Sequence, residues 1–346
     1  MFAQSIDLVK GPALGVNSAI QKSGSVDLGS GGRPKPLPRE FKPMLASPWT
    51  EPPEGPDWIA EVKWDGYRAI AIIEGSKVRL LSRNGLSLGK KFEEIVTELE
   101  SLNLDSAILD GEVVAVDQDG IPRFELLQRY QQKPQGALLY YVFDLPYLHG
   151  KDLTRLPLLR RRELLKSVLA ENEVIRFSGA VEGEGKRFFE LASQRGLEGI
   201  VAKRKDSTYQ PGRRSKSWLK IKSRMQQEAV IGGITEPSGS RKHFGALMLG
   251  VYDGGKLRYV GHTGTGFSEE MLKDILKRLT PYFTDTCPFD PRPKANARLQ
   301  WVKPKLVCEV AFQEWTSDGK LRAPAFLGLR EDKVPTEVVR EVAITH

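Results

Sequence analysis

The chain has 346 residues, of which 40% are hydrophobic and 28% charged, an ordinary composition for a globular protein that is long enough for two domains. Its formal net charge of +8 indicates a polyanionic partner. The chain has two cysteines without a CxxC pair and four scattered histidines, which argues against a disulfide framework and a zinc finger. It has neither a long apolar run nor a signal-peptide pattern, so we expect a cytoplasmic protein without a membrane span.

Residues 1–40 contain GSVDLGSGGRPKPLPRE, a segment rich in Gly, Ser and Pro without a sustained apolar period. This composition predicts a flexible leader or an interdomain linker. A linker would tether a neighbouring domain of a longer protein. The chain becomes more apolar around residue 41, where we place the start of the first folded domain.

The stretch Ile59–Ile73, IAEVKWDGYRAIAII, predicts a β-hairpin. Alternating residues lead to Asp65-Gly66, which is a strong turn signal, and a second β-rich run follows. The bend would hold Lys63 and Arg68 on opposite sides. A lysine with an ordinary pKa of ~10.4 has only about one neutral amine in a thousand at pH 7, but nearby cations and partial burial lower that pKa and create a nucleophile. The alternative interpretation of Lys63 is a solvated turn residue.

Two further elements follow this stretch. Apolar spacing across residues 90–103 predicts a helix, and the turn SRNG before it carries Arg83. Residues 107–116, AILDGEVVAV, repeat the pattern of strand, Asp-Gly and strand. They predict a second hairpin, with Glu112 as an exposed carboxylate.

The next segment predicts a short helix in PRFELLQRY, then a strand in ALLYYVFDLPYLHG. We expect this strand to stop at Asp144, with Tyr141 and Phe143 on one face. The amphipathic sequence DLTRLPLLRRRELLKSVL predicts another helix, with Pro157 near its start. Its triple arginine, Arg160–Arg162, predicts a solvated helix face.

A helix over residues 186–195 is expected to end at the following glycine. Next comes the most basic stretch of the chain, LEGIVAKRKDSTYQPGRRSKSWLKIKSR. The alternating pattern at each end of this stretch predicts a strand. Glu198 lies at the start of the first strand, and Lys220 and Lys222 lie on one side of the second. Lysines that face water would be unremarkable. Lysines that share a cleft with Lys63 would bind a triphosphate and lower the pKa of the nucleophile.

Four motifs occur in order: KxDGxR at 63–68, LDGEVV at 109–114, EGIVAK at 198–203 and WLKIK at 218–222. They resemble the nucleotidyl-transfer motifs of ATP-dependent DNA ligases and mRNA capping enzymes. With SRNG and the YYVFD run, the resemblance covers nearly all of residues 59–222. It implies an α+β fold in which residues 41–222 form a nucleotidyltransferase (adenylation) domain of antiparallel sheets and helices. The sequence GxxxxGK[ST] is absent, so we expect no P-loop.

The resemblance also implies a mechanism, in which Lys63 attacks the α-phosphorus of ATP, pyrophosphate leaves and a lysine–AMP phosphoramidate remains. Glu112 and Glu198 would bind a divalent metal, Mg²⁺ or Mn²⁺, because hard cations accept carboxylates without His or Cys. Glu61 would contact adenine, with a simple ion-pair partner as the alternative. The remaining residues implied at the site are Arg68, Arg83, Glu112 at the ribose, Phe143 stacked on adenine, Lys220, Lys222, and Asp65 in the motif of Lys63.

From residue 228 the pattern changes to short strands, with one helix at residues 269–279. This pattern suggests a small Greek-key barrel of the OB type, which commonly binds nucleic acid. We therefore expect an OB-fold domain over residues 228–346 and a hinge over residues 223–227. The Gly-rich GHTGTGF at 261–267 fits no nucleotide-binding template and predicts a strand-end turn.

The segment LRAPAFLGLREDK resembles the last motif of the same family through Arg322, Pro324, Phe326, Arg330, Asp332 and Lys333. The resemblance implies that this segment swings over the active site to orient pyrophosphate and then turns away so that DNA can bind. A charged C-terminal loop is the alternative. With the preceding EVAFQEWTSDGK, the segment looks especially like the ligase domain of bacterial end-joining ligases of the LigD type. Ala323 departs from that pattern, which often has His there.

Taken with the resemblance, the sequence predicts an ATP-dependent DNA ligase that seals nicks or joined ends through a lysine–AMP and a DNA-adenylate, in double-strand break repair by non-homologous end joining. We expect a monomer at the bacterial nucleoid. Its substrate partner would be duplex DNA. Ku and the polymerase or phosphoesterase modules of an end-joining system are candidate protein partners. Two alternatives stay open. One is a capping guanylyltransferase or RNA ligase, which would use GTP or RNA ends, and the other is a non-catalytic DNA-binding scaffold.

Overall fold

The computed structural model describes residues 32–131, 134–237, 242–294 and 298–343. These residues form two units, and the second unit comprises Arg224–Val342. The predicted leader lies largely outside the described residues. Its described part includes β1 (Arg33–Pro34), which pairs with β8 (Lys151–Asp152). None of the described helices has the length and apolar character needed to cross a membrane.

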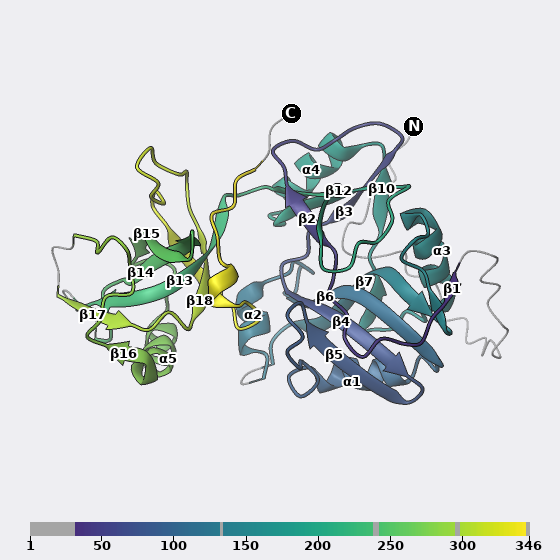
Figure 1. Ribbon diagram of the computed structural model, residues 1–346, viewed down its shortest axis with the longest axis horizontal. Coiled ribbons are helices and arrows are strands. Elements are labelled where there is room, and N and C mark those ends of the chain that lie inside the picture. Colours follow the sequence, from purple (N-terminus) through teal and green to yellow (C-terminus); the bar gives the residue numbers. More distant parts are fainter. Residues whose placement is uncertain (1–31, 132–133, 238–241, 295–297, 344–346) are drawn as a thin grey trace. The chain divides into compact units, whose positions relative to one another are not determined.

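The first unit contains two sheets and four described helices (Figure 1). The first sheet has the strand order β1-β8-β7-β6-β4-β5, with β9 beside β7. The second sheet has the order β10-β3-β11-β12-β2. Besides β1 and β8, the first sheet consists of β4 (Tyr67–Glu74), β5 (Lys77–Ser82), β6 (Ser106–Val116), β7 (Ala137–Leu148) and β9 (Ile175–Phe177). The second consists of β2 (Leu45–Pro48), β3 (Trp58–Val62), β10 (Ala180–Glu182), β11 (Gly199–Arg204) and β12 (Arg214–Lys222).

Helices cover one face of each sheet. One face of the first sheet packs against α1, and this core includes Tyr67, Ala69 and Ile95. One face of the second sheet packs against α4, and this core includes Ala60 and Phe188. The helices are α1 (Glu93–Glu100), α2 (Phe124–Arg129), α3 (Leu158–Val168) and α4 (Gly185–Gln194). The other faces of the two sheets meet in a smaller cluster, which contains Ile59, Phe143, Trp218 and Met44.

The hairpin predicted for Ile59–Ile73 is wrong, although both of its strands are present. Strand β3 pairs with β10 and β11, whereas β4 pairs with β5 and β6 in the other sheet. The Asp65-Gly66 bend therefore carries the chain from one sheet to the other. A Cβ atom at Gly66 would lie 2.0 Å from the carbonyl oxygen of Val113, so only glycine fits where the bend crosses β6.

The second predicted hairpin is also wrong, because residues 107–116 lie within one continuous strand, β6. Its register against β7 shifts on both sides of Asp110, which is a β-bulge rather than a turn. A Cβ atom at Gly111 would lie 2.5 Å from the Tyr141 carbonyl oxygen, so glycine allows the close approach of β7. Strand β7 does not stop at Asp144 but continues to Leu148.

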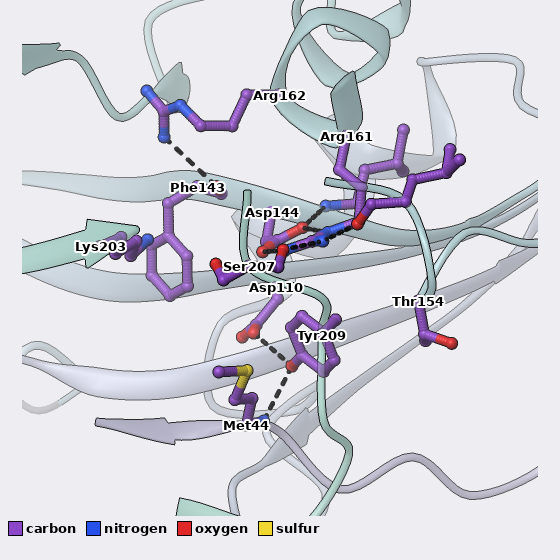
Figure 2. A network of polar contacts seen from close by, with 12 residues as sticks. Met44, Asp110, Phe143, Asp144, Thr154, Arg161, Arg162, Lys203, Ser207 and Tyr209 are labelled. Atoms are coloured by element: carbon purple, nitrogen blue, oxygen red, sulfur yellow. Dashed lines mark hydrogen bonds and ion pairs between the residues drawn. The ribbon is translucent and has the colours of Figure 1, made fainter. Parts of the chain in front are cut away.

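The predicted helices are present, but the solvated face expected at Arg160–Arg162 is wrong for two of the three arginines. The Arg161 side chain is fully buried, and the Arg162 residue is 7% exposed. Arg161 donates from Nε and Nη2 to the two carboxylate oxygens of Asp144 at 2.7 and 2.9 Å, as Figure 2 shows. Only Arg160 remains at the surface, where it pairs with Glu163.

In the second unit, the described residues form short antiparallel strands and one α-helix, which pack around one core. Strand β13 is central, because it pairs with β14, β17 and β18. The helix α5 (Glu269–Leu279) begins after Ser268, whose hydroxyl accepts from the Met271 amide. The strands are β13 (Gln226–Thr235), β14 (Leu247–Asp253), β15 (Lys256–Thr263), β16 (Phe283–Thr284), β17 (Leu299–Val302), β18 (Val307–Ala311) and β19 (Ala325–Leu329), and 3₁₀ turns cover Thr280–Tyr282 and Pro335–Glu337.

An ion network lies against this second core. Arg330 donates to Glu309 at 2.7 Å and to both oxygens of Asp332 at 2.9 Å. Lys333 pairs with Glu228 at 2.6 Å. Burial alone would raise the pKa of Glu228, but Lys333 and Arg330 outweigh this effect and lower that pKa to about 2. The pKa of Asp332 is likewise lowered, because Arg330 outweighs the effect of burial.

Replacing Arg161 with Met tests the buried pair on α3. The change leaves the Asp144 carboxylate buried without its cation, which costs about 3–5 kcal/mol. We expect the free energy of unfolding to fall by that amount in urea titrations followed by circular dichroism. The matched control is R160M on the same helix, where the exposed pair with Glu163 contributes at most about 1 kcal/mol. Equal losses in the two variants would contradict the assignment.

The network in the second unit predicts a loss of stability in acid. Glu228 has a folded pKa of about 2 against an ordinary value of 4.5, so its contribution is complete above pH 4.5 and is lost as the pH falls toward 2. We expect the urea midpoint to decline over this range, and the decline to be shallower in K333M. K256M, which removes an exposed pair with Asp290, is the control. An unchanged pH slope in K333M would rule out Lys333 as its source.

Candidate active site

The register of the second sheet gathers four of the predicted site residues on one face. Glu61 on β3 lies opposite Val201 on β11, which lies opposite Lys220 on β12. Lys222 lies opposite Gly199, whose carbonyl oxygen accepts from the Lys63 amide at 3.0 Å. Because residues opposite one another across a sheet share a face, Glu61, Lys63, Lys220 and Lys222 lie on the same side.

The Lys63 amine contacts the carboxylate of Glu198. Lys63 follows the end of β3 and Glu198 precedes β11, so the pairing of these strands brings the two residues together. The Lys63 side chain is 19% exposed, whereas that of Glu198 is 5% exposed. The amine can therefore reach a ligand, and the carboxylate beside it is an ion-pair partner within the protein.

Arg68 and Glu112 face each other from β4 and β6, and Tyr141 on β7 follows in the same row. The Arg68 guanidinium donates to both oxygens of Asp110, at 2.6 and 2.7 Å. Burial alone would lower the pKa of Arg68, but Asp110 raises it well above its ordinary value. Arg68 is thus a fixed cation in the first sheet.

Asp110 has a second partner, the hydroxyl of Tyr209, which donates at 2.6 Å and itself accepts from the Met44 amide at 3.0 Å (Figure 2). Burial, followed by Asp110, raises the pKa of Tyr209 well above its ordinary value. The phenol therefore stays protonated and donates. This chain of contacts holds Asp110 in place behind Arg68.

The ring of Phe143 lies between the two sheets, and two cations approach it. The Arg68 guanidinium carbon is 4.5 Å from the ring centroid, and the Lys203 amine is 4.2 Å from it. Figure 2 shows Lys203 beside this ring. The stacking of Phe143 on adenine stays a prediction.

Glu61 is 2% exposed and contacts two buried cations. Its Oε1 atom accepts from Arg162 Nη1 at 2.7 Å and lies 2.9 Å from Lys203 Nζ. Its Oε2 atom has a long contact of 3.4 Å with the hydroxyl of Ser178. The ion-pair interpretation of Glu61 is therefore realised, and its contact with adenine stays a prediction.

Asp65 and Arg83 lie outside the row of lysines. Asp65 is half-buried in the connection between β3 and β4, and Arg83 is half-buried in the turn after β5 of the first sheet. The structure thus places Arg83 in a different sheet from Lys63. The nucleotide-binding role of Arg83 stays a prediction.

The residues of the last motif belong to the second unit. Arg330, Asp332 and Lys333 take part in the ion network described above. Arg322 is exposed and pairs with Glu314 at 2.6 Å. In this structure, these residues have partners within their own unit, and their predicted action on pyrophosphate stays a prediction.

Sequence reasoning missed Arg162 and Lys203 as parts of the site. A signal for Arg162 was present, because it lies four residues after Leu158 and three before Leu165, both fully buried. Arg162 therefore shares the buried face of α3. Lys203 closes the EGIVAK motif, but its orientation depends on the pairing of β11 with β3.

The carboxylates suit a hard cation that keeps water and phosphate ligands. Among the described residues, no group of three or more His, Cys, Asp or Glu side chains could hold a metal ion. Glu112 lies on β6 of the first sheet, whereas Glu198 directly precedes β11 of the second. One or two carboxylates are what Mg²⁺ uses when phosphates supply the remaining ligands.

Family models match both parts of the chain. Residues 43–222 match the model described as ATP dependent DNA ligase domain, and residues 240–333 match the model described as ATP dependent DNA ligase C terminal region. The first match alone covers more than half of the chain. It includes Lys63, Glu112, Glu198, Lys220 and Lys222.

Curated proteins are similar to the chain over most of its length. The chain is 40% identical over 321 residues to the multifunctional non-homologous end joining protein LigD of Pseudomonas aeruginosa, covering 90% of this chain and 38% of that protein. It is 39% identical over 308 residues to the protein of the same name from Mycolicibacterium smegmatis, covering 88% and 40% of the two chains. The chain thus spans about 40% of the length of these relatives.

Solved structures extend the match to the fold. A mycobacterial DNA ligase D complexed with ATP and MES is similar with a TM-score of 0.65 and 38% identity, covering 87% of this chain and 98% of that one. The expected α+β fold, an adenylation domain followed by an OB-fold domain, is therefore confirmed. The ordered motifs, the shared face of their lysines and the two family models lead to one conclusion, which is that this chain belongs to the family of ATP-dependent DNA ligases.

Proposed function

We propose that the chain is an ATP-dependent DNA ligase that seals nicks or joined ends in duplex DNA during non-homologous end joining. The observation that carries the proposal is the register of β3, β11 and β12, which gathers Lys63, Lys220 and Lys222 on one face beside Glu198. The names of the similar LigD proteins, which are described as non-homologous end joining proteins, support the end-joining context.

In the first step, the Lys63 amine attacks the α-phosphorus of ATP. A nitrogen–phosphorus bond forms, the bond to pyrophosphate breaks, and the proton that the amine loses leaves with the pyrophosphate. Negative charge grows on the phosphate oxygens as this happens. Lys220 and Lys222 lie on the face of Lys63, where their ammonium groups would stabilise that charge.

A divalent metal, Mg²⁺ or Mn²⁺, would be held by Glu198 and Glu112, with phosphate oxygens and water as its other ligands. When bound, it would neutralise phosphate charge and orient the leaving pyrophosphate. Arg68, which Asp110 holds in place, and Arg83 would bind the nucleotide beside it. Asp65 would position the Lys63 loop.

In the later steps, an oxygen of a DNA 5′-phosphate displaces Lys63 from the AMP phosphorus, and a 3′-hydroxyl then displaces AMP. The OB-fold unit would bind duplex DNA, and Arg322, Arg330, Asp332 and Lys333 would assist the first step. The proposal also includes a hinge at residues 223–227. It further includes Ku, or polymerase and phosphoesterase modules, as protein partners.

Self-adenylylation is the direct test. Incubation with α-labelled ATP and Mg²⁺, followed by denaturing electrophoresis, should label the wild-type protein. K63A should remain unlabelled, because it has no amine to form the phosphoramidate. The exposed K77A is the control and should label as the wild type does. Label on K63A equal to that on the wild type would remove Lys63 from the mechanism.

DNA binding should depend on exposed basic residues at the start of β12 and directly before it. Arg213 and Lys216 are exposed in the most basic stretch of the chain. Neutralising both, as R213Q/K216Q, should weaken binding to a nicked duplex and reduce the slope of log K against log salt by about 2. K77Q is the matched control. Fluorescence anisotropy at several salt concentrations measures the slope, and a slope equal to that of the control would exclude these residues from phosphate binding.

A further inference from the structure

Glu61, Arg162, Lys203 and Ser178 form a buried group that we call the Glu61 cluster. All four are less than a tenth exposed. Two cations share the single Glu61 carboxylate, and both approach its Oε1 atom. Burying an ion costs several kcal/mol. An arrangement with more cations than carboxylates therefore calls for an explanation beyond the packing of helix α3.

The cluster uses the two oxygens of Glu61 unequally. Oε1 has both cations, whereas the one contact of Oε2 among the described residues is with Ser178 at 3.4 Å, which is long for a hydroxyl donor. The Ser178 oxygen itself accepts from the indole of Trp64 at 3.0 Å, so its hydrogen is turned toward Oε2. One oxygen of a fixed carboxylate thus keeps most of its capacity to accept.

Arg162 fixes this geometry from three directions. It donates to Oε1 of Glu61 and to the carbonyl oxygens of Phe143 and Ser178, at 2.7, 3.3 and 2.8 Å. Figure 2 shows it extending toward the backbone of Phe143. Its guanidinium therefore joins β3, β7 and the segment before β10. This keeps the carboxylate in one position relative to the Phe143 ring.

Lys203 completes the cluster with a second positive charge. Its amine lies 2.9 Å from Oε1, and it lies over the rings of Phe143 and Trp218, 4.2 and 4.3 Å from their centroids. Aromatic faces attract a cation at such distances. Burial lowers the pKa of Lys203 more than the Glu61 carboxylate raises it.

The position of Glu61 relative to Lys63 indicates which part of a nucleotide it meets. The two residues share a strand face and are two positions apart, a spacing of about 7 Å. A nucleotide whose α-phosphorus is at Lys63 can reach Glu61 with its base. An ionised carboxylate only accepts hydrogen bonds, so it favours the exocyclic amine of adenine over the carbonyl at the same position of hypoxanthine or guanine.

We propose that Arg162 and Lys203 are positioning residues that hold Glu61 as an ionised acceptor, and that they thereby set the preference for adenine over 6-oxopurines. The inference rests on the proposed nucleotidyl transfer to Lys63. It assigns a function in base specificity to two cations that do not touch the base and act on it through Glu61. A site built to accept from an amine rejects an analogue without it strongly, because its buried acceptor is then left unpaired.

Rates of covalent adduct formation with α-labelled ATP and ITP test the proposal, since the two bases differ at the 6-position that Glu61 would meet. We expect the wild-type ratio of kcat/KM for ATP to that for ITP to exceed about 100. R162M and K203M should each lower this ratio at least tenfold, mainly by slowing the reaction with ATP. E61Q, which offers a donor as well as an acceptor, should lower it as well.

Two controls separate positioning from folding. R160M changes the exposed neighbour on α3 and should keep the wild-type ratio. R162K retains a cation and should recover part of the ratio lost in R162M. Thermal melting identifies any variant that is unfolded, and in that case R162K and E61Q decide the question.

The outcomes are distinct. Equal losses with ATP and ITP, so that the ratio stays at its wild-type value, would show that the cluster only supports the fold and would overturn the inference. A wild-type protein that forms no adduct with any nucleotide would instead overturn the proposed function, and the inference with it. A reduced ratio in R162M and K203M with an unchanged ratio in R160M supports both.

Discussion

The site depends on how three neighbouring strands are aligned. Lys63, Glu61, Lys220 and Lys222 share a face only because β3, β11 and β12 pair in one register. A slip of one residue between two of these strands would move the side chains of one to the opposite face, where Ala60, Ile200 and Leu219 now pack with α4. The apolar face thus fixes the register, and the register fixes which face carries these four side chains. The residues that form the core therefore also determine where the candidate site lies.

Local patterns predicted much of this. Period-two alternation was enough to put Lys220 and Lys222 on one side, and helical spacing was enough to place α1, α3 and α5. The partners of the strands were not predictable, because Asp-Gly signals a sharp bend and not which sheet follows it. Gly66 is required by the approach of Val113, a contact between residues far apart in the chain. The local sequence thus predicts that a segment forms a strand, but it does not predict which strand that segment pairs with.

The buried arginines show the same limit more clearly. A run of three arginines suggests solvent, since charged side chains are seldom fully buried without a partner. Arg161 finds Asp144 17 residues earlier, and Arg162 finds Glu61 101 residues earlier. In the second unit, Arg330 is buried for the same reason, between Glu309 and Asp332. A charged side chain is buried in this protein where the fold places an oppositely charged residue beside it. Short stretches of sequence cannot show this, because the two partners are far apart in the chain.

The unequal use of the Glu61 oxygens has a consequence for small molecules aimed at this site. Two cations already occupy one side of the carboxylate, so a compound with a fixed positive charge would be repelled as it approached. A neutral amino-heteroaromatic could donate to the second oxygen without that repulsion. Under the proposed role of Glu61, selective inhibitors would therefore carry uncharged amines, and protonated analogues of the same scaffold would bind less tightly.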